Sequence, residues 1–198
     1  MRLFVAAEIS EEARAAIARA VEALRRKFEG VRWEGPEKYH FTLKFLGEVG
    51  ADRLESVTEG VSRASLGVDP FTVRLKGFGS FPPGGNPRVV WIGADEGGAE
   101  LSALGRRVEA DMAALGFAPE AREFHPHVTI GRVRGGGRSG SLAGLREALL
   151  ARAGESLGGE FRVERVVLLE SRLGPGGSRY TLVRAAPLRG GDSGGAGR

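Results

Sequence analysis

The chain has 198 residues, of which 41% are hydrophobic and 27% charged, and this size suits one domain or two small lobes that share a core. It contains no cysteine, so disulfide bonds, thiolate nucleophiles and cysteine-ligated metal sites are excluded. The net charge of +4 mildly favours an anionic ligand. The first apolar stretch ends at Glu8, and no apolar run approaches the roughly 18 residues of a membrane span. We therefore expect a cytoplasmic protein that does not enter a membrane.

Two helices and four strands are predicted in the first half of the chain. Apolar residues recur every three or four positions at 11–28 and at 52–65, which is typical of helices with one buried face. Short apolar or alternating runs indicate strands at residues 2–9, 38–47, 71–78 and 87–94. The last two are separated by the run SFPPGGNP, which favours a hairpin-like connection.

The second half partly repeats this order. Helices are predicted at 98–115 and 142–153, and strands at 125–133, 160–170 and 179–185. The run RGGGRSG (134–140) is expected to form a flexible loop, and residues 190–198 a disordered tail, because they have little apolar content to bury. The strand pairs within 71–94 and 160–185 lack an intervening helix, and no strand–glycine-rich–helix phosphate loop occurs. These features favour an α+β fold with mainly antiparallel sheets and helices on one face of each.

One tetrapeptide pattern occurs twice. Residues 40–43 read His-Phe-Thr-Leu and residues 127–130 read His-Val-Thr-Ile, 87 positions apart. Residues two apart in a strand share a face, so His40 points the same way as Thr42, and His127 the same way as Thr129. The apolar residues between them point into a core. Two of the three histidines of the chain therefore lie in matched strand contexts.

These residue types suit acid–base chemistry on a phosphate ester. Imidazoles with an ordinary pKa of about 6.5 can divide the work, one accepting a proton and the other donating one. Each threonine hydroxyl can donate a hydrogen bond to an anionic oxygen. Two such pairs facing one cleft could hydrolyse a phosphodiester without a metal, each proton transfer contributing about 10²–10⁴ in rate.

The sequence around both copies resembles the two-histidine phosphoesterase superfamily, and specifically its RNA 2′,3′-cyclic phosphodiesterases, also known as 2′-5′ RNA ligases. The resemblance is carried by WEGPEKYHFTLKFLGEV (33–49) and REFHPHVTIGR (122–132). The opening RLFVAAEI, the segment VVWIG (89–93) and LLESRLGPGGSRYTLV (168–183) also fit the pattern of that family. The similarity covers nearly all of residues 1–188.

The resemblance implies a bilobal fold in a single domain, residues 1–189, with two pseudo-symmetric, mainly antiparallel sheets facing a central cleft and helices on the outer faces. It implies hydrolysis of 2′,3′-cyclic phosphate RNA ends to 2′-phosphates without metal or other cofactor. By the same analogy His40 is the general acid and His127 the general base, although the symmetry of the motifs does not distinguish them. Thr42 and Thr129 would bind the phosphate oxygens, and Arg132 would lie near the phosphate.

Several neighbouring residues have two interpretations each. His125 could pair with His127 in a metal site, or lie at the rim. Lys44 alternates onto the face of His40, which suggests either a phosphate contact or a solvated strand end. For Arg132 a salt bridge or an RNA-backbone contact are the alternatives, and Gly131 could permit a bulge that re-aims its side chain. Three aromatic residues flank the motifs and could stack on a base or belong to the core: Trp33, Tyr39 and Phe124.

The proposed partner is RNA with a cyclic phosphate end, including tRNA halves, and the arginines at 132, 134 and 138 could guide its backbone or merely be solvated. A second possible function is ATP-independent 2′-5′ joining of RNA halves, which would use the same site in reverse. A third is a non-catalytic nucleotide- or RNA-binding module in the same cleft. No obligate protein partner is implied.

Overall fold

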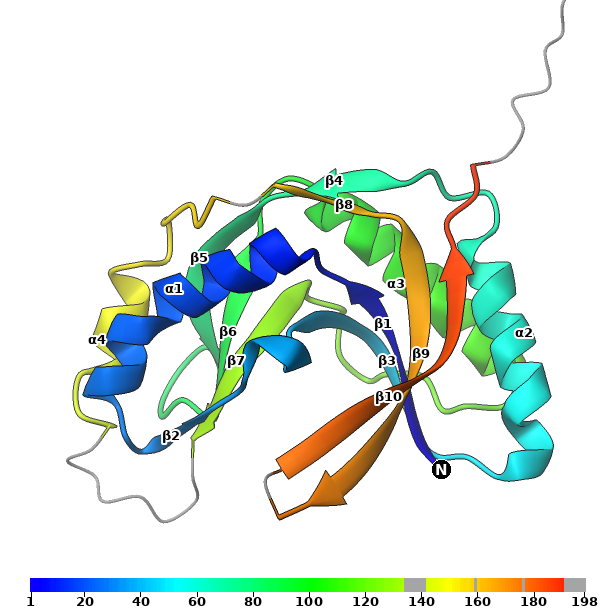
Figure 1. Cartoon of the computed structure of the whole chain (residues 1–198), viewed down its shortest axis with the longest axis horizontal. Coiled ribbons are helices and arrows are strands. Elements are labelled where there is room, and N and C mark those ends of the chain that lie inside the picture. The colour runs from blue at the N-terminus through cyan, green and yellow to red at the C-terminus, as the bar shows by residue number, and fades with distance from the viewer. Residues whose placement is uncertain (134–141, 159, 176, 191–198) are drawn as a thin grey trace, which may run out of the picture.

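A large antiparallel sheet runs through both halves of the molecule in the computed structural model (Figure 1). The structure describes residues 1–133, 142–158, 160–175 and 177–190. The predicted loop at 134–140 and residues 191–198 of the predicted tail lie outside these ranges. In chain order the elements are β1 (Arg2–Glu8), α1 (Glu11–Lys27), β2 (Val31–Trp33), the 3-10 turn η1 (Pro36–Lys38), β3 (His40–Glu48), the 3-10 turn η2 (Ala51–Arg53), α2 (Leu54–Ser65), β4 (Phe71–Val73), β5 (Leu75–Phe81), β6 (Val89–Ala94), α3 (Gly98–Ala114), β7 (His127–Val133), α4 (Leu145–Leu150), β8 (Phe161–Val163), β9 (Arg165–Gly174) and β10 (Gly177–Pro187).

The large sheet consists of two half-sheets. Its strand order is β10-β9-β1-β3-β7-β6-β5, with β2 paired to β7. In the described part of the chain β3 and β7 share one backbone pairing, Phe41 with Val128, whereas β1 and β3 pair along their whole length. We call β10-β9-β1-β3 the His40 half-sheet and β2, β7, β6 and β5 the His127 half-sheet. The predicted α+β architecture with two antiparallel sheets is confirmed, and the sheets meet edge to edge at that one pair.

Helices α1 and α3 each lie against the half-sheet that does not contain the strand before them. Helix α1 leaves β1 of the His40 half-sheet and lies with α4 beside β5, β6 and β7 (Figure 1). Helix α3 leaves β6 of the His127 half-sheet and packs against β3 and α2, while α2 packs against β9 and β10. Each lobe is therefore built from both halves of the chain, so that neither motif has a complete lobe of its own.

Helix α1 shows how local sequence produces these elements. The hydroxyl of Ser10 caps its first turn by accepting a hydrogen bond from the Ala13 amide at 3.1 Å. Acidic residues occupy its first turn and basic residues its last, as the helix dipole favours. The apolar stripe is buried, as the three- and four-residue spacing predicts: Ala13, Ala16, Ile17, Val21 and Leu24.

Two predicted strands are each divided in the structure. The run predicted at 71–78 contains β4 and the start of β5, and the run at 160–170 contains β8 and the start of β9. The chain bends at Arg74, whose amide donates to the Glu96 carbonyl instead of continuing one ladder. As a result β4 pairs with β8 in a separate two-stranded sheet. The strand predicted from 125 begins at His127, because Pro126 has no amide hydrogen for the ladder. The helix predicted at 142–153 covers only Leu145–Leu150.

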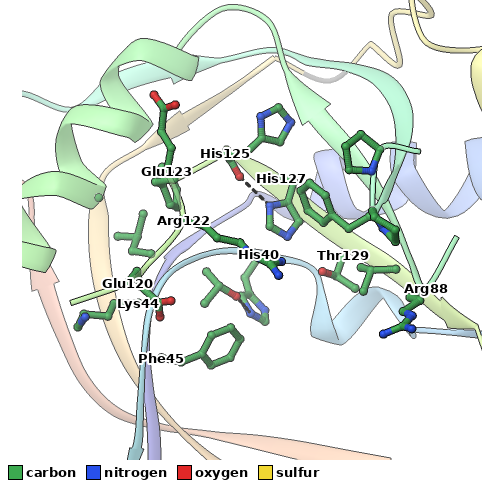
Figure 2. A pocket seen from close by; sticks show the side chains of 18 of the residues that line it. His40, Lys44, Phe45, Arg88, Glu120, Arg122, Glu123, His125, His127 and Thr129 are labelled. Carbon is green, nitrogen blue, oxygen red and sulfur yellow. Dashed lines mark hydrogen bonds between the residues drawn. The ribbon is translucent and has the colours of Figure 1, made fainter. Parts of the chain in front are cut away.

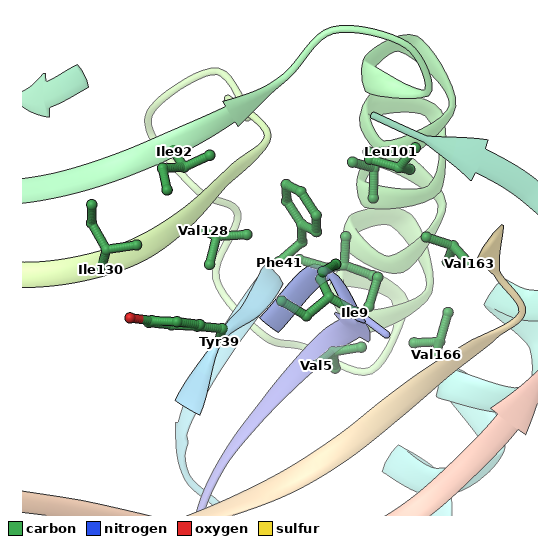
Figure 3. Close-up of a cluster of buried hydrophobic side chains, with 14 of the residues drawn as sticks. Val5, Ile9, Tyr39, Phe41, Ile92, Leu101, Val128, Ile130, Val163 and Val166 are labelled. Carbon is green, nitrogen blue, oxygen red and sulfur yellow. The ribbon is translucent and has the colours of Figure 1, made fainter. Parts of the chain in front are cut away.

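The core lies directly behind the two motifs (Figure 3). The apolar partners of the motif histidines and threonines are buried as predicted: Phe41, Leu43, Val128 and Ile130. Tyr39 is also fully buried there, so of its two interpretations the core position is correct. Within the described ranges, no helix combines the length and apolar character needed to cross a membrane.

Candidate active site

The two motifs line one cavity of about 1340 Å³. Strands β3 and β7 are neighbours in the sheet, and alternation along each strand turns the histidine and threonine away from the core. The cavity is lined by all four of these residues, His40, Thr42, His127 and Thr129. Figure 2 shows three of them, His40, His127 and Thr129, pointing into the same space. The structure thus brings together the paired residues that the sequence predicts.

A backbone carbonyl orients His127. Its Nδ1–H donates to the carbonyl oxygen of His125 at 2.7 Å, which leaves Nε2 without the ring hydrogen in the neutral form. Phe81 packs edge-on against the ring, with 5.0 Å between centroids. Burial lowers the pKa of His127, the hydrogen bond to His125 raises it, and the nearby charge of Arg132 lowers it. Neutral His127 therefore offers a lone pair on Nε2 to a proton donor.

His40 is more strongly affected by burial. Its pKa is lowered to about 4, mainly by burial and to a lesser degree by Arg14, His127 and Arg132, while the backbone at Lys38 acts in the opposite direction. Its Nε2 lies 3.0 Å from the Thr42 hydroxyl.

The ring of His40 packs against aromatic residues of its own half-sheet. Phe4 lies 5.0 Å away between centroids, and Tyr180 lies edge-on at 5.4 Å. The two motif histidines therefore have different aromatic environments.

A bulge follows the threonine in both motif strands. In β3 the neighbouring residues Val5 and Ala6 of β1 pair with Lys44 and Thr42, so Leu43 is the extra residue. In β7 the corresponding extra residue is Ile130. A bulge re-aims the side chains that follow it. In both motif strands, therefore, the alternation of side chains between the two faces of the sheet is reversed immediately after the threonine.

The bulge in β7 turns Arg132 toward the cavity, which it lines. An unbroken strand would have turned this side chain the other way. The Arg132 side chain is 47% exposed, and its Nε lies 3.9 Å from a carboxylate oxygen of Glu34. Glu34 also lies near Arg32 and Lys38. Arg132 therefore has both a position in the cavity and a loose ion pair.

Of the two interpretations of Lys44, the solvated strand end is wrong, while a phosphate contact stays a prediction. The residue is 2% exposed, and its ammonium group donates to both carboxylate oxygens of Glu109 at 2.8 Å. The bulge at Leu43 turns the side chain off the face shared by His40 and Thr42. Simple alternation does not hold beyond the bulge, although Lys44 and Glu109 both still line the cavity.

The other flanking residues are divided between the core and the rim. The ring of His125 lies 4.9 Å from Trp91 between centroids, on the cavity rim. Trp33 packs against the core and donates its indole N–H to the Phe28 carbonyl at 3.1 Å. Phe124 packs against the core and also lines the cavity. Arg134 and Arg138 lie outside the described residues.

Some cavity residues gave no signal in the sequence. Tyr180 enters from β10, remote from both motifs in the chain, and Phe81 comes from the end of β5. Three further arginines line the cavity from separate segments, namely Arg88, Arg106 and Arg122. Only the alternation within 179–185 could have predicted which face of the strand carries Tyr180, and nothing in the sequence indicated which sheet edge that strand joins.

Within the described ranges, no group of three or more acidic or histidine side chains is close enough to hold a metal ion.

Comparison with known proteins places this architecture in a class. A sequence model of the LigT-like phosphoesterases matches the chain twice, over residues 8–91 and 92–180. The first match contains the His40 motif and the second the His127 motif. Each half of the chain thus carries one unit of the family, which accounts for the pseudo-symmetry of the two motif strands. The fold, the cavity and the duplicated motif define a two-histidine phosphoesterase.

Individual relatives agree over most of their length. An RNA 2′,3′-cyclic phosphodiesterase of Methanothermobacter thermautotrophicus is 35% identical over 181 residues, covering 91% of this chain and 95% of that protein. One from Methanocaldococcus jannaschii is 33% identical, covering 93% and 99%. The crystal structure of TT0787 of Thermus thermophilus has a TM-score of 0.79 at 30% identity, covering 96% and 99% of the two chains. E. coli LigT complexed with 3′-AMP has a TM-score of 0.73 at 26% identity, covering 94% and 97%. The chain belongs to the LigT-like phosphoesterase family, and the predicted resemblance is confirmed.

Proposed function

We propose that the chain is an RNA 2′,3′-cyclic phosphodiesterase that converts cyclic phosphate ends to 2′-phosphates without a metal or other cofactor. The observation that carries this proposal is the position of both H-x-T motifs on neighbouring strands that line one cavity. The relatives named above as RNA 2′,3′-cyclic phosphodiesterases support the choice of substrate. The catalytic unit would be a single domain of residues 1–189, because each half-sheet draws strands from both halves of the chain.

His127 is proposed to be the general base. Its Nδ1–H is committed to the His125 carbonyl, so the lone pair of Nε2 is available to water. His127 removes a proton from the water as the water oxygen forms a bond to phosphorus. The depressed pKa keeps the imidazole neutral, as a base must be, near pH 7.

His40 is proposed to be the general acid. As the P–O3′ bond breaks on the side opposite the attacking water, protonated His40 gives its proton to O3′, and the product is a 2′-phosphate with a free 3′-hydroxyl. A pKa of about 4 in the unliganded protein is too low for an acid at neutral pH. A phosphate anion beside the ring raises that pKa by favouring the charged imidazolium. Substrate binding would therefore prepare the acid.

The remaining groups would hold the anion and the RNA. The hydroxyls of Thr42 and Thr129 line the cavity and can donate to the non-bridging phosphate oxygens. Arg132 would add charge to the same group, although its partner Glu34 competes for it. Arginines at the rim would contact the RNA backbone by charge. Substrates of this class include tRNA halves, and by microscopic reversibility the same groups could join a cyclic phosphate end to a 5′-hydroxyl in a 2′-5′ linkage.

The test is incubation with an oligoribonucleotide ending in a 2′,3′-cyclic phosphate, followed by separation of the 2′- and 3′-phosphate products. We expect only the 2′-phosphate, unchanged turnover in EDTA, and a bell-shaped pH profile. His40→Ala and His127→Ala should each lower turnover about 10²–10⁴-fold with the fold retained. His125→Ala is the matched control, because it keeps the backbone carbonyl that orients His127, and it should stay within several-fold of the parent. Full activity in either motif variant, or nucleotide binding without hydrolysis at any pH, would contradict the proposal.

A further inference from the structure

The buried lysine that follows the first motif is the strongest feature that the proposed chemistry leaves unused. The side chain of Lys44 is 1% exposed. Its ammonium group has three acceptors, the two carboxylate oxygens of Glu109 at 2.8 Å each and the Ala118 carbonyl at 2.9 Å. All three hydrogens of the ammonium are thus directed at oxygen atoms of a different part of the chain.

These contacts join three segments. Lys44 lies in β3 directly after the bulge at Leu43, and Glu109 lies in α3. Ala118 is in the connection between α3 and β7. A second bond to the same connection comes from the Glu120 amide, which donates to Glu109 at 3.2 Å. The strand that carries the first motif is therefore tied to the segment that leads into the second.

Side-chain packing provides the other anchors of the connection after α3, including the His125 ring against Trp91 and Phe81. Residues 118–126 form no helix or strand. Downstream of the Lys44 contacts, the Phe124 ring packs on Gly105 of α3, where an added Cβ would lie 3.2 Å from the ring. The next residue is His125, whose carbonyl accepts the Nδ1–H of His127. The position of that carbonyl depends on how the preceding segment is held.

Stability alone is a weak reason for such a pair. Burying the Lys44 ammonium costs several kcal/mol, its partner Glu109 stays 29% exposed, and apolar replacements of buried ion pairs are often as stable. Lys44 and Glu109 make hydrogen bonds, which are directional. They can therefore fix the relative positions of three segments, which an apolar pair would not do. The pair is thus better suited to holding a geometry than to adding stability.

We infer that Lys44 and Glu109 are positioning residues for His127, because they hold the 118–126 connection so that the His125 carbonyl selects the Nδ1–H tautomer of that ring. The inference rests on the proposed function for its effect on turnover. Without the clamp the ring samples both tautomers, and the fraction with a free Nε2 lone pair facing the cavity falls. The loss should appear in kcat, since the groups proposed to bind phosphate are untouched.

The experiment compares two isosteric changes on α3. Glu109→Gln removes the charge held by Lys44, whereas Asp111→Asn removes one held by Arg63 of α2 at 3.2 Å. We expect Glu109→Gln to lower kcat about 10- to 100-fold, as loss of outer-shell partners does at metal sites, with KM changed less than about twofold. Asp111→Asn should leave both constants unchanged. In ¹⁵N NMR of the imidazole nitrogens, His127 should be the Nδ1–H tautomer in the parent and in Asp111→Asn, and a mixture in Glu109→Gln.

Lys44→Met extends the test, and its effect combined with Glu109→Gln should be no larger than that of the more damaging single change. If Lys44→Met fails to fold, the isosteric Glu109→Gln still decides. A Glu109→Gln protein that is merely less stable, with parental kcat and a single His127 tautomer, overturns the inference. The tautomer measurement needs no turnover, so an inactive parent would contradict the proposed function while leaving the positioning role to be judged by NMR.

Discussion

The two motif strands begin alike and then diverge. Both carry His-x-Thr toward the cavity, and both bulge at the residue after the threonine. At the second position beyond the bulge, β7 presents the cation Arg132 and β3 presents Phe45, which is 58% exposed, and both side chains line the cavity. At the first position β3 has the buried Lys44, where β7 has Gly131. The repeated backbone therefore presents charge on one side of the cavity and an aromatic ring on the other.

The two histidines also differ in their surroundings. The His40 ring rests on Phe4 and Tyr180, in a small apolar cluster on the cavity side of its half-sheet. The His127 ring has Phe81 at its edge. Burial lowers the pKa of each, but only the shift of His40 is large. Repetition of a motif thus supplies two proton carriers, while residues outside the motif make them different.

The largest expected effect tests which histidine is the acid. A cyclic substrate with sulfur in place of O3′ has a leaving group that departs without a proton. On this substrate His40→Gln should regain most of the roughly 10²–10⁴-fold loss it shows with the oxygen substrate, and His127→Gln should regain none. Single-turnover rates of both variants on both substrates provide the measurement. Rescue of the His127 variant instead would reverse the assignment of acid and base.

The pH dependence of stability tests the deeper burial of His40. In the unfolded chain this group titrates near 6.5 and in the folded protein at about 4, so protonation favours unfolding. The stabilisation is present above pH 6.5 and is lost as the pH falls toward 4, by roughly 3 kcal/mol. Urea unfolding at pH 7 and pH 4.5 should show that His40→Gln removes most of this difference, and His127→Gln a smaller part. If the free energy of unfolding falls between pH 7 and pH 4.5 by the same amount in the parent and in His40→Gln, the depressed pKa of His40 is contradicted.

The two threonines should differ in how much kcat/KM falls when each is replaced. Replacement of either by valine removes a hydrogen bond to an anionic oxygen, a change of about 1.5–3 kcal/mol or about 10- to 100-fold in kcat/KM. Thr42→Val should fall at the larger end, because its hydroxyl is also within 3.0 Å of His40 Nε2. Steady-state kinetics on the cyclic-phosphate oligonucleotide would measure both. A larger loss for Thr129→Val would mean that the contact between Thr42 and His40 does not matter in the bound state.

The smallest effect concerns the charge difference between the strands. Arg132 is half exposed and loosely paired, so Arg132→Ala should raise KM only about two- to fivefold at low salt, and less at high salt where charges are screened. Phe45→Ala, at the matching position of β3, should change KM without altering its salt dependence. Measuring KM from low to high potassium chloride separates the two. A salt-independent Arg132→Ala effect would argue against a charge contact with the substrate.

Much of the architecture follows from local patterns. The three- and four-residue spacing of apolar side chains was sufficient for α1, α2 and α3, because a helix buries one continuous stripe. The strands divided at Arg74 and Glu164 were predicted as continuous, because the bends arise where the Arg74 amide donates to Glu96 and the Glu164 carbonyl accepts from Leu188, both in distant segments. The paired histidines and threonines were predictable because a strand alternates. Lys44 was not, since a single extra residue at Leu43 reverses the alternation.

The sequence by itself determined the two H-x-T motifs, the apolar residues behind them and the family to which the chain belongs, because strand alternation and motif identity are properties of consecutive residues. The tertiary structure decided that both motif strands are neighbours in one sheet, joined through Phe41 and Val128. It also decided that Tyr180 lies against His40 and that Lys44 is bound to Glu109. These contacts join residues far apart in the chain, which come together only through the pairing of distant strands and the packing of α3 on β3.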